Sequence, residues 1–340
     1  MRRVYEELWE NLEAGKRSVL VNVLKETAQE QRLFREETLE CGTGDPLAEL
    51  ARQAHRENAL RVLDTPEGTA FAEPYVPEPR LIVLGGGHIA LPLTEFAASC
   101  GFSVTVVDDR PAFANTERFP RASRVICDSF ENALKSLALN RYCFVVVITR
   151  GHRHDMFCLR EALRHETAYV GMIGSKNRVR TVRDALLEEG VEQALLDRVC
   201  APIGLKIGAV TPAEIAVSIL AEAILYKRTL NKEAWPELDR EVLAVLRDAR
   251  DVPFAVATVL DAKGSTPRGA GAKMLVWPDG RIAGSIGGGC SEGEAIQAAY
   301  EVIRTGKPSM YTVDLTGGTA EDEGMVCGGR MRLAIVRYDG

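Results

Sequence analysis

The stretch Arg80-Leu-Ile-Val-Leu-Gly-Gly-Gly-His-Ile-Ala90 decides the fold of the middle of this chain. A short apolar strand ends in three glycines, and residues 89–100 continue with a helical pattern. The pattern G-x-G-x-x-A between a strand and a helix permits a tight turn and lets a pyrophosphate approach the helix N-terminus. It predicts a dinucleotide-type turn that places Gly85, Gly87 and His88 at a ligand.

Helical stretches separate the further strands that the sequence predicts, at residues 103–107, 124–127, 144–149 and 168–173. Apolar strands without polar alternation suit a parallel sheet that is covered on both faces. Asp108 and Asp109 end the second strand, where an acid can bond a ribose 2′-hydroxyl. We therefore expect an α/β, Rossmann-like, doubly wound parallel sheet over residues 80–230, with Asp108 beside the glycine turn. The alternative is a Rossmann-shaped domain that keeps the turn and binds no nicotinamide.

The composition of the chain is that of a globular protein. Its 340 residues are 46% hydrophobic and 26% charged, which suggests two or three domains. The net charge of −6 argues against a general nucleic-acid-binding face. The sequence contains no apolar run of about 18 residues, so no transmembrane helix is expected. Charged residues follow Met1, so no secretory signal is expected. The 8 cysteines contain no C-x-x-C pair, and a reducing cytoplasm is the simplest compartment.

A proline-rich joint at residues 73–79 and a second joint at residues 231–236 divide the chain into three segments. We expect domains at residues 1–76, 80–230 and 240–340, and the last of these is rich in glycine.

A weak internal repeat relates the first segment to the last. Residues 7–24 parallel 241–260, and residues 68–76 parallel 329–338. The first copy lacks the glycine motifs, so we interpret it as a shortened version of the last domain without the residues that could carry chemistry. A chance similarity of two helix–strand units is the alternative.

Gly151-His-Arg-His-Asp155 directly follows the strong apolar strand. In an open α/β sheet the loops after the strand C-termini hold ligands, so we place His152 and His154 at the ligand. Two histidines and an aspartate can bind a metal or a phosphate, or form a structural loop. One short segment rarely completes a metal site, and no metal is assigned.

Two further features have a structural alternative. Gly174-Ser-Lys-Asn-Arg178 offers Lys176 and Arg178 to an anion, or else it is an ordinary helix start with solvated charges. Five cysteines lie in or beside apolar stretches, and we interpret them as small core residues: Cys100, Cys127, Cys143, Cys158 and Cys200.

Glycine-rich motifs with cysteines mark the last domain: Lys263-Gly-Ser-Thr-Pro-Arg268, Gly284-Ser-Ile-Gly-Gly-Gly-Cys-Ser-Glu292 and Gly324-Met-Val-Cys-Gly-Gly329. Consecutive glycines let main-chain N–H groups approach a ligand, and a helix N-terminus favours a thiolate. We assign catalytic roles to Cys290, Cys327 and Glu292. Cofactor contacts are assigned to Ser265, Arg268, Gly287, Gly288 and Gly289. Tight turns with incidental cysteines are the alternative.

These motifs resemble the XdhC/CoxI family, accessory factors for the maturation of xanthine dehydrogenase and related molybdenum hydroxylases. The resemblance covers residues 68–340 and includes the glycine turn, Val107-Asp-Asp-Arg110, Gly151–Asp155 and the cysteine motifs. In the family the glycine-rich cysteine domain usually precedes the Rossmann domain. Here a reduced copy precedes that domain and the full copy follows it.

The resemblance implies that the chain binds molybdenum cofactor (molybdopterin) and delivers it to an apo xanthine dehydrogenase-type molybdoenzyme. A separate sulfurtransferase, such as a cysteine desulfurase, is linked to this step. The chain is then a maturation factor rather than a stand-alone catalyst. An NAD(P)-dependent oxidoreductase and an assembly scaffold without a small ligand are the alternatives.

We also expect the two domains to build one site. The glycine loops of the last domain should face the Rossmann crevice near His88, His152 and His154, within one chain or across a homodimer. The Rossmann part has histidines without a well-placed thiol, and the last domain has thiols without a histidine. No nucleic-acid or membrane partner is expected.

Overall fold

The computed structural model describes residues 2–39, 44–230, 235, 239–248, 252–264, 266, 268–288, 290–314 and 329–339. The chain divides into two compact units. Residues 78–234 form the Rossmann unit, and residues 1–77 together with 235–340 form what we call the two-sheet unit. Within the described residues, no helix combines the length and the apolar character that crossing a bilayer requires.

A parallel sheet of six strands is the centre of the Rossmann unit, in the order β10-β9-β8-β5-β6-β7 among the described residues. The strands are β5 (Arg80–Leu84), β6 (Ser103–Asp108), β7 (Arg124–Cys127), β8 (Cys143–Val147), β9 (Tyr169–Met172) and β10 (Val199–Cys200). Every neighbouring pair is parallel. Counted from β5, this is the strand order 3-2-1-4-5-6 of doubly wound dinucleotide-binding folds. The predicted fold class is therefore confirmed.

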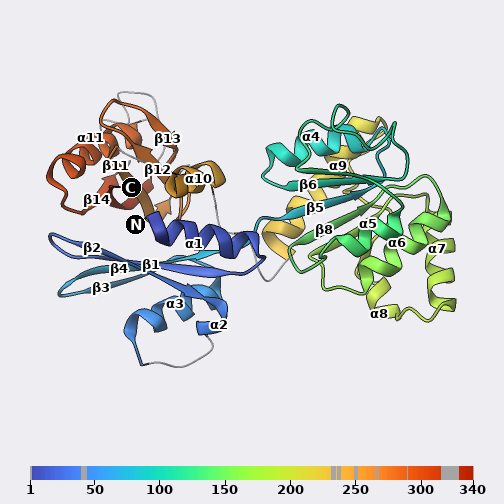
Figure 1. Ribbon diagram of the computed structural model, residues 1–340, viewed down its shortest axis with the longest axis horizontal. Coiled ribbons are helices and arrows are strands. Elements are labelled where there is room, and N and C mark those ends of the chain that lie inside the picture. Colours follow the sequence, from blue (N-terminus) through green and yellow to red (C-terminus); the bar gives the residue numbers. More distant parts are fainter. Residues whose placement is uncertain are drawn as a thin grey trace. The chain divides into compact units, whose positions relative to one another are not determined.

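Helices cover both faces of this sheet (Figure 1). On one face lie α4 (Ala90–Ser99) and α9 (Pro212–Leu225), which η1 (Tyr226–Leu230) extends; on the other lie α5 (Phe130–Ser136), α6 (His152–Leu163), α7 (Lys176–Glu188) and α8 (Gln193–Leu196). Pro92 is the third residue of α4, within the first turn, where its missing N–H removes no helical bond. Thr211 and Glu214 form a capping box at the start of α9.

In the part of the chain that the structure describes, two antiparallel sheets make up the two-sheet unit. The first has the order β2-β1-β4-β3, with β1 (Ser18–Leu24), β2 (Gln29–Arg35), β3 (Arg61–Thr65), β4 (Gly68–Tyr75) and the helices α1 (Arg2–Glu13), α2 (Glu36–Leu39) and α3 (Pro46–Glu57). The second has the order β13-β12-β11-β15-β14, with β11 (Phe254–Gly264), β12 (Lys273–Val276), β13 (Ile282–Gly284), β14 (Ser309–Asp314), β15 (Gly329–Tyr338) and the helices α10 (Arg240–Asp248) and α11 (Cys290–Thr305).

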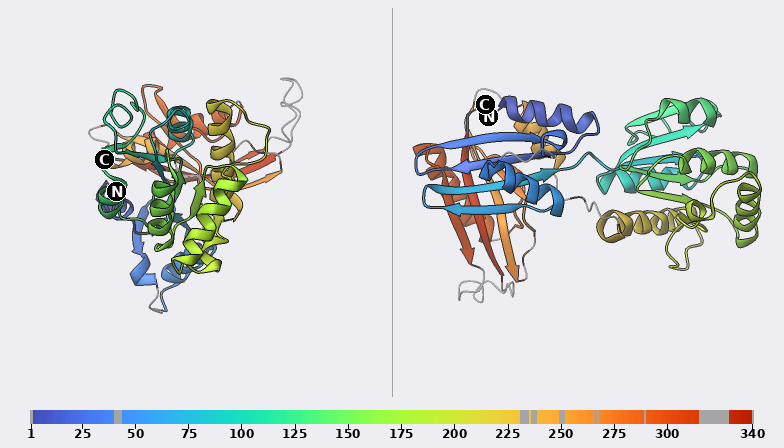
Figure 2. Two further views of the ribbon diagram at one scale, coloured as in Figure 1. Left: turned by 90° about the vertical axis from the view of Figure 1, so that its right-hand side faces the viewer. Right: turned by 90° about the horizontal axis from the view of Figure 1, so that it is seen from below.

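The two sheets share one core. Leu20 of β1 and Val256 of β11 belong to a single buried cluster, together with side chains of α1 and α10. The alternate residues point outward: Val19 packs under α3, and Ala255 packs under α11. This period-two alternation gives four layers, α3, first sheet, second sheet and α11 (Figure 1). The strands of one sheet run across those of the other (Figure 2), which is the orthogonal type of sheet packing.

The two sheets have corresponding elements in the same order. Each begins with a helix and a central strand, and each ends with an edge strand that pairs with a second central strand. Ser18 opens β1 opposite Tyr75, and Phe254 opens β11 opposite Tyr338. The second central strands, β4 and β15, are the segments that the internal repeat relates to each other. This topology supports the proposal that residues 1–76 are a reduced copy of the last domain.

A buried ion pair joins the sheets. The Lys273 ammonium contacts the Glu73 carboxylate, and these side chains are 8% and 6% exposed. Lys273 Nζ also donates to Thr258 Oγ1 at 3.1 Å, and Asn22 Nδ2 donates to Glu73 Oε2 at 3.1 Å. Both charges are therefore paired and hydrogen-bonded, which is the condition under which a protein interior tolerates them.

Replacing Lys273 by Met is expected to lower the free energy of unfolding by about 3–5 kcal/mol, because Glu73 is left buried without a counter-charge. The double variant Glu73→Leu, Lys273→Met should regain most of that loss, since it removes both charges. Urea unfolding followed by tryptophan fluorescence measures this unit alone, because Trp9, Trp235 and Trp277 all belong to it.

The control is Lys307→Met, which removes an exposed lysine of the same unit and should change stability by less than about 0.5 kcal/mol. A Lys273→Met protein as stable as the parent would contradict the role given to the ion pair.

Candidate functional site

The predicted glycine turn lies at the C-terminal edge of the parallel sheet, between β5 and α4. A Cβ at Gly85, where φ is +119°, would lie 2.4 Å from the carbonyl oxygen of Ile148. A Cβ at Gly86 would lie 2.0 Å from the carbonyl oxygen of Phe113, whereas a Cβ at Gly87 would meet nothing within 4 Å. The fold itself therefore requires Gly85 and Gly86. Gly87 leaves open space at the position where a ligand phosphate approaches such a turn.

The first turn of α4 has no side-chain cap. Its N-cap residue is Ile89, and no acidic residue lies in the first turn. The N–H groups at such a helix start attract anions. His88 is exposed beside them.

Asp108 lies beside the turn, as predicted, but its carboxylate is occupied. Its Oδ2 accepts a hydrogen bond from Gly86 N at 2.8 Å and one from Arg110 Nη2 at 2.9 Å. Its Oδ1 accepts from Arg110 N at 3.1 Å and from Arg110 Nε at 2.8 Å. Burial alone would raise the pKa of Asp108, but these bonds outweigh burial and hold the pKa below its usual value.

A carboxylate has about four lone-pair sites, and here four donors fill them. Asp108 is also only 2% exposed. In this arrangement it fixes the glycine turn and has no acceptor left for a ribose hydroxyl.

Asp109 is partly exposed at the same edge, and its Oδ2 accepts from Arg150 Nη2 at 2.9 Å. Asp109 follows β6 and Arg150 follows β8, so this ion pair spans the edge across β5. The strand order reverses there, which is where open α/β sheets bind ligands. Neither Arg150 nor Arg110 has a role predicted from the sequence, although Arg110 stands in one of the motifs quoted above.

The segment from His152 to Asp155 is the first turn of α6 rather than a loop, and Gly151 is the N-cap. Asp155 is fully buried, and its carboxylate accepts from Thr149 Oγ1 at 2.6 Å and from Arg178 Nε at 2.8 Å. This contact ties α6 and α7 to the end of β8. It neutralises Arg178, which the sequence pattern offers to an anion.

His154 and Ser175 both have structural roles. The His154 ring packs on Phe130 with 5.2 Å between ring centres. Ser175 caps α7 through a bond to Arg178 N, which is the ordinary helix start named as the alternative. Among the described residues, no group of three or more His, Cys, Asp or Glu side chains is arranged to hold a metal ion.

The cysteines of the Rossmann unit differ in burial. Cys143 and Cys158 are buried as predicted, and burial raises the pKa of each thiol. The prediction is wrong for Cys100 and Cys127, which are exposed. Cys100 follows α4 and Cys127 ends the edge strand β7, and both places border solvent.

A second glycine turn, residues 284–288, precedes α11 in the two-sheet unit. Glu292 Oε1 accepts from Ser285 Oγ at 2.6 Å, from Gly288 N at 2.9 Å and from Ile286 N at 3.1 Å. Burial alone would raise the pKa of Glu292, but these donors outweigh burial and lower the pKa. Glu292 is thus an ionised acceptor that shapes this turn, and a catalytic role for it stays a prediction.

The other residues assigned in the last domain have the following positions. Gly287 and Gly288 lie in this turn with φ of +135° and +78°. Cys290 is the first residue of α11, so its predicted place at a helix N-terminus is confirmed. Ser265, Gly289 and Cys327 lie outside the described residues.

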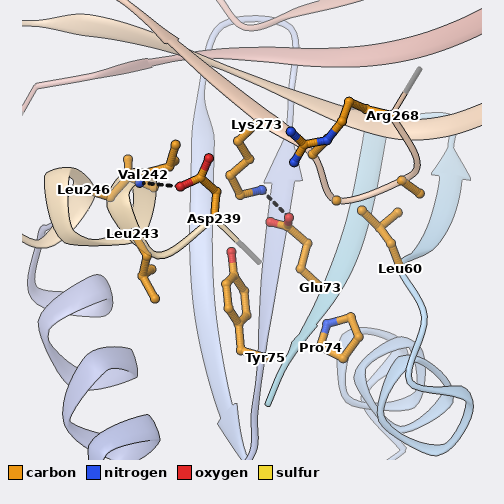
Figure 3. A pocket seen from close by; sticks show the side chains of 13 residues that line it. Leu60, Glu73, Pro74, Tyr75, Asp239, Val242, Leu243, Leu246, Arg268 and Lys273 are labelled. Carbon is orange, nitrogen blue, oxygen red and sulfur yellow. Dashed lines mark hydrogen bonds and ion pairs between the residues drawn. The ribbon is translucent and has the colours of Figure 1, made fainter. Parts of the chain in front are cut away.

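Arg268 lines a pocket between the two sheets, together with Glu73, Tyr75, Asp239 and Lys273 (Figure 3). The cavity volume is about 40 Å³, room for two or three waters at ~15 Å³ each. Tyr75 Oη is buried, and it has no hydrogen-bond partner among the described residues. Burial and then the charge of Glu73 raise the pKa of Tyr75, so its hydroxyl stays protonated and can donate into the pocket.

Tyr338 occupies the equivalent position on β15, and its hydroxyl donates to the Leu246 carbonyl at 2.6 Å. We expect Tyr338→Phe to cost about 1–3 kcal/mol, because it leaves that buried carbonyl unpaired. Tyr75→Phe breaks no bond within the described residues, so stability should stay within about 0.5 kcal/mol of the parent. Urea unfolding compares the two variants. Equal losses would show that Tyr75 has an internal partner after all.

The glycine turn of the Rossmann unit allows a matched pair of variants. Gly86→Ala should destabilise this unit by about 1–3 kcal/mol, because the added methyl group would overlap the Phe113 carbonyl. Gly87→Ala should leave stability within about 0.5 kcal/mol, since its methyl group meets open space. Thermal unfolding followed by circular dichroism tests both. A Gly87→Ala loss as large as that of Gly86→Ala would show that the fold itself requires Gly87.

Two family models match the chain. The XdhC Rossmann domain matches residues 81–223, and the XdhC and CoxI family matches residues 248–314. The chain is 35% identical over 154 residues to a probable xanthine dehydrogenase subunit of Bacillus subtilis, which covers 45% of this chain and 44% of that protein. It is 32% identical over 185 residues to the uncharacterized protein YqeB of Escherichia coli, 53% of this chain and 34% of that protein.

These alignments span less than half the length of either curated relative. A crystal structure of a xanthine dehydrogenase from Bacillus halodurans is similar, with a TM-score of 0.53 and 29% identity over 65% of each chain. The two family matches cover the unit with the parallel sheet and most of the glycine-rich second sheet. With both domains matched, this chain belongs to the XdhC and CoxI family.

Proposed function

We propose that this chain is an accessory factor that binds molybdenum cofactor and delivers it to a xanthine dehydrogenase-type molybdenum hydroxylase. Family membership and the similarity to a probable xanthine dehydrogenase subunit support an accessory role. The observation that carries the proposal is the chemistry of the Rossmann edge. The uncapped start of α4 offers main-chain N–H groups beside the open space at Gly87, while internal bonds fill the acceptors of Asp108 and pair Asp155 with Arg178. Such an edge is built to hold an anion rather than to transfer a proton.

The cofactor is cargo in this proposal, and its groups match the residues present. Its phosphate suits a glycine turn and a helix start. Its dithiolene-bound metal suits a soft thiolate ligand, which we assign to Cys290 or Cys327. The client is an apo-molybdoenzyme, with a cysteine desulfurase as the source of sulfur and a homodimer as the working form.

The rival function, an NAD(P)-dependent oxidoreductase, has less support. An acid at the end of the second strand would hold the ribose, and Asp108 has no free acceptor for it. Hydride transfer by the purified protein in the absence of a molybdoenzyme would favour this alternative.

The proposal predicts that the double variant Cys290→Ser, Cys327→Ser loses the cofactor. The parent protein, purified from a cell that makes molybdenum cofactor, should carry pterin that fluoresces after oxidation. The double variant should retain less than about a tenth of it, because a thiolate is the soft ligand for the metal.

The matched control is Cys100→Ser, Cys127→Ser, which removes two exposed thiols of the Rossmann unit and should retain pterin as the parent does. Unchanged retention in the Cys290→Ser, Cys327→Ser variant would refute the role of these thiols. A parent protein without pterin, also after incubation with free cofactor, would refute the function.

A further inference from the structure

Arg118 is held against the glycine turn without an acidic partner. Its Nε donates to the carbonyl oxygen of Gly86 at 3.2 Å. Its guanidinium carbon lies 5.2 Å from the ring centre of Phe113 and 5.7 Å from that of Phe119. Among the described residues, no carboxylate forms an ion pair with it. The side chain is fixed in place while its charge is not neutralised.

Three other arginines at this edge are neutralised. Arg110 pairs with Asp108, Arg150 pairs with Asp109, and Arg178 pairs with Asp155. These three pairs cancel, so Arg118 contributes a net positive charge directly beside the turn.

The geometry of Arg118 is that of a binding group held in advance. A guanidinium has five N–H donors, and the Gly86 carbonyl uses one of them. The remaining donors form the planar fork that binds a phosphate through two parallel hydrogen bonds. Stacking on aromatic rings restricts the side chain, which lowers the entropy lost on binding. The backbone of Gly86 connects this fork directly to the open position of Gly87.

We propose that Arg118 recognises a phosphate monoester at the glycine turn, so that the Rossmann unit selects a phosphorylated ligand over the same ligand without that phosphate. The inference rests on the proposed function insofar as the pterin cofactor carries such a group. A dinucleotide with a 2′-phosphate carries the same group, and the experiment separates the two sources. In either case the recognised chemistry is a phosphate dianion.

The test uses the full chain and two pairs of probes. One pair is NADP⁺ and NAD⁺, and the other is an oxidised, fluorescent pterin phosphate and its dephosphorylated form. Titration calorimetry and fluorescence give the dissociation constants. The parent should prefer the phosphorylated member of one pair by at least about tenfold, the usual size for one charge-assisted hydrogen-bonded contact. The pair that shows the preference identifies the source of the phosphate.

The variant Arg118→Gln should reduce this preference to less than about twofold and leave the affinity for the unphosphorylated member unchanged. Arg118→Lys keeps the charge without the fork and should retain part of the preference, so it also covers the case in which Arg118→Gln does not fold. The control is Arg121→Gln, which removes an exposed charge from the same segment and should keep the full preference.

The inference is overturned if neither probe pair shows a preference, or if the Arg118 variants keep it in full. These outcomes are distinct from failure of the proposed function. A parent that retains pterin without a phosphate preference overturns only the role of Arg118. A parent that prefers the phosphate on NADP⁺ and retains no pterin overturns only the cofactor-delivery function.

Discussion

The shared core of the two-sheet unit is the constraint on which the rest of that unit depends. Leu8 and Phe71 come from its first segment, and Leu275 comes from its last, yet all three lie in one buried cluster. Each sheet has an apolar inner face that it cannot bury alone. The ion pair of Glu73 and Lys273 adds an electrostatic requirement, because either charge would be costly without the other. Lys273 of the second sheet is therefore paired with a residue that lies 200 positions earlier in the chain.

Both glycine turns are held by a carboxylate from within the protein. Asp108 accepts the N–H of Gly86, and Glu292 accepts the N–H groups of Ile286 and Gly288. Hydrogen bonds to the ionised form lower the pKa of each acid despite burial, so both stay charged at neutral pH. A turn with positive φ and closely spaced N–H groups would otherwise have several conformations. Each acid stabilises one conformation of its turn. Ligand binding then depends on groups other than these two carboxylates.

The sequence predicted the fold of the middle unit well, because its signals are local. Apolar runs and the glycine turn each depend on neighbouring residues, and the structure confirms them. The two-residue strand β10 was missed because it is too short to give a pattern. The roles of side chains were harder to predict. That Asp108 is saturated, or that Asp155 neutralises Arg178, follows from contacts between elements that periodicity cannot show.

The two sheets carry different side chains at equivalent positions. From the strand registers, Glu73 of β4 corresponds to Val336 of β15, and Tyr75 corresponds to Tyr338. The second sheet has an apolar side chain where the first has the counter-charge of Lys273, and its tyrosine is satisfied by a main-chain carbonyl. The first sheet thus contributes Glu73 and Tyr75 to the pocket, where they lie beside Asp239, Arg268 and Lys273 of the last segment. Glu73, which comes from a segment without glycine motifs, pairs with Lys273 of the glycine-rich segment, so the two sheets are best understood as one chemical unit.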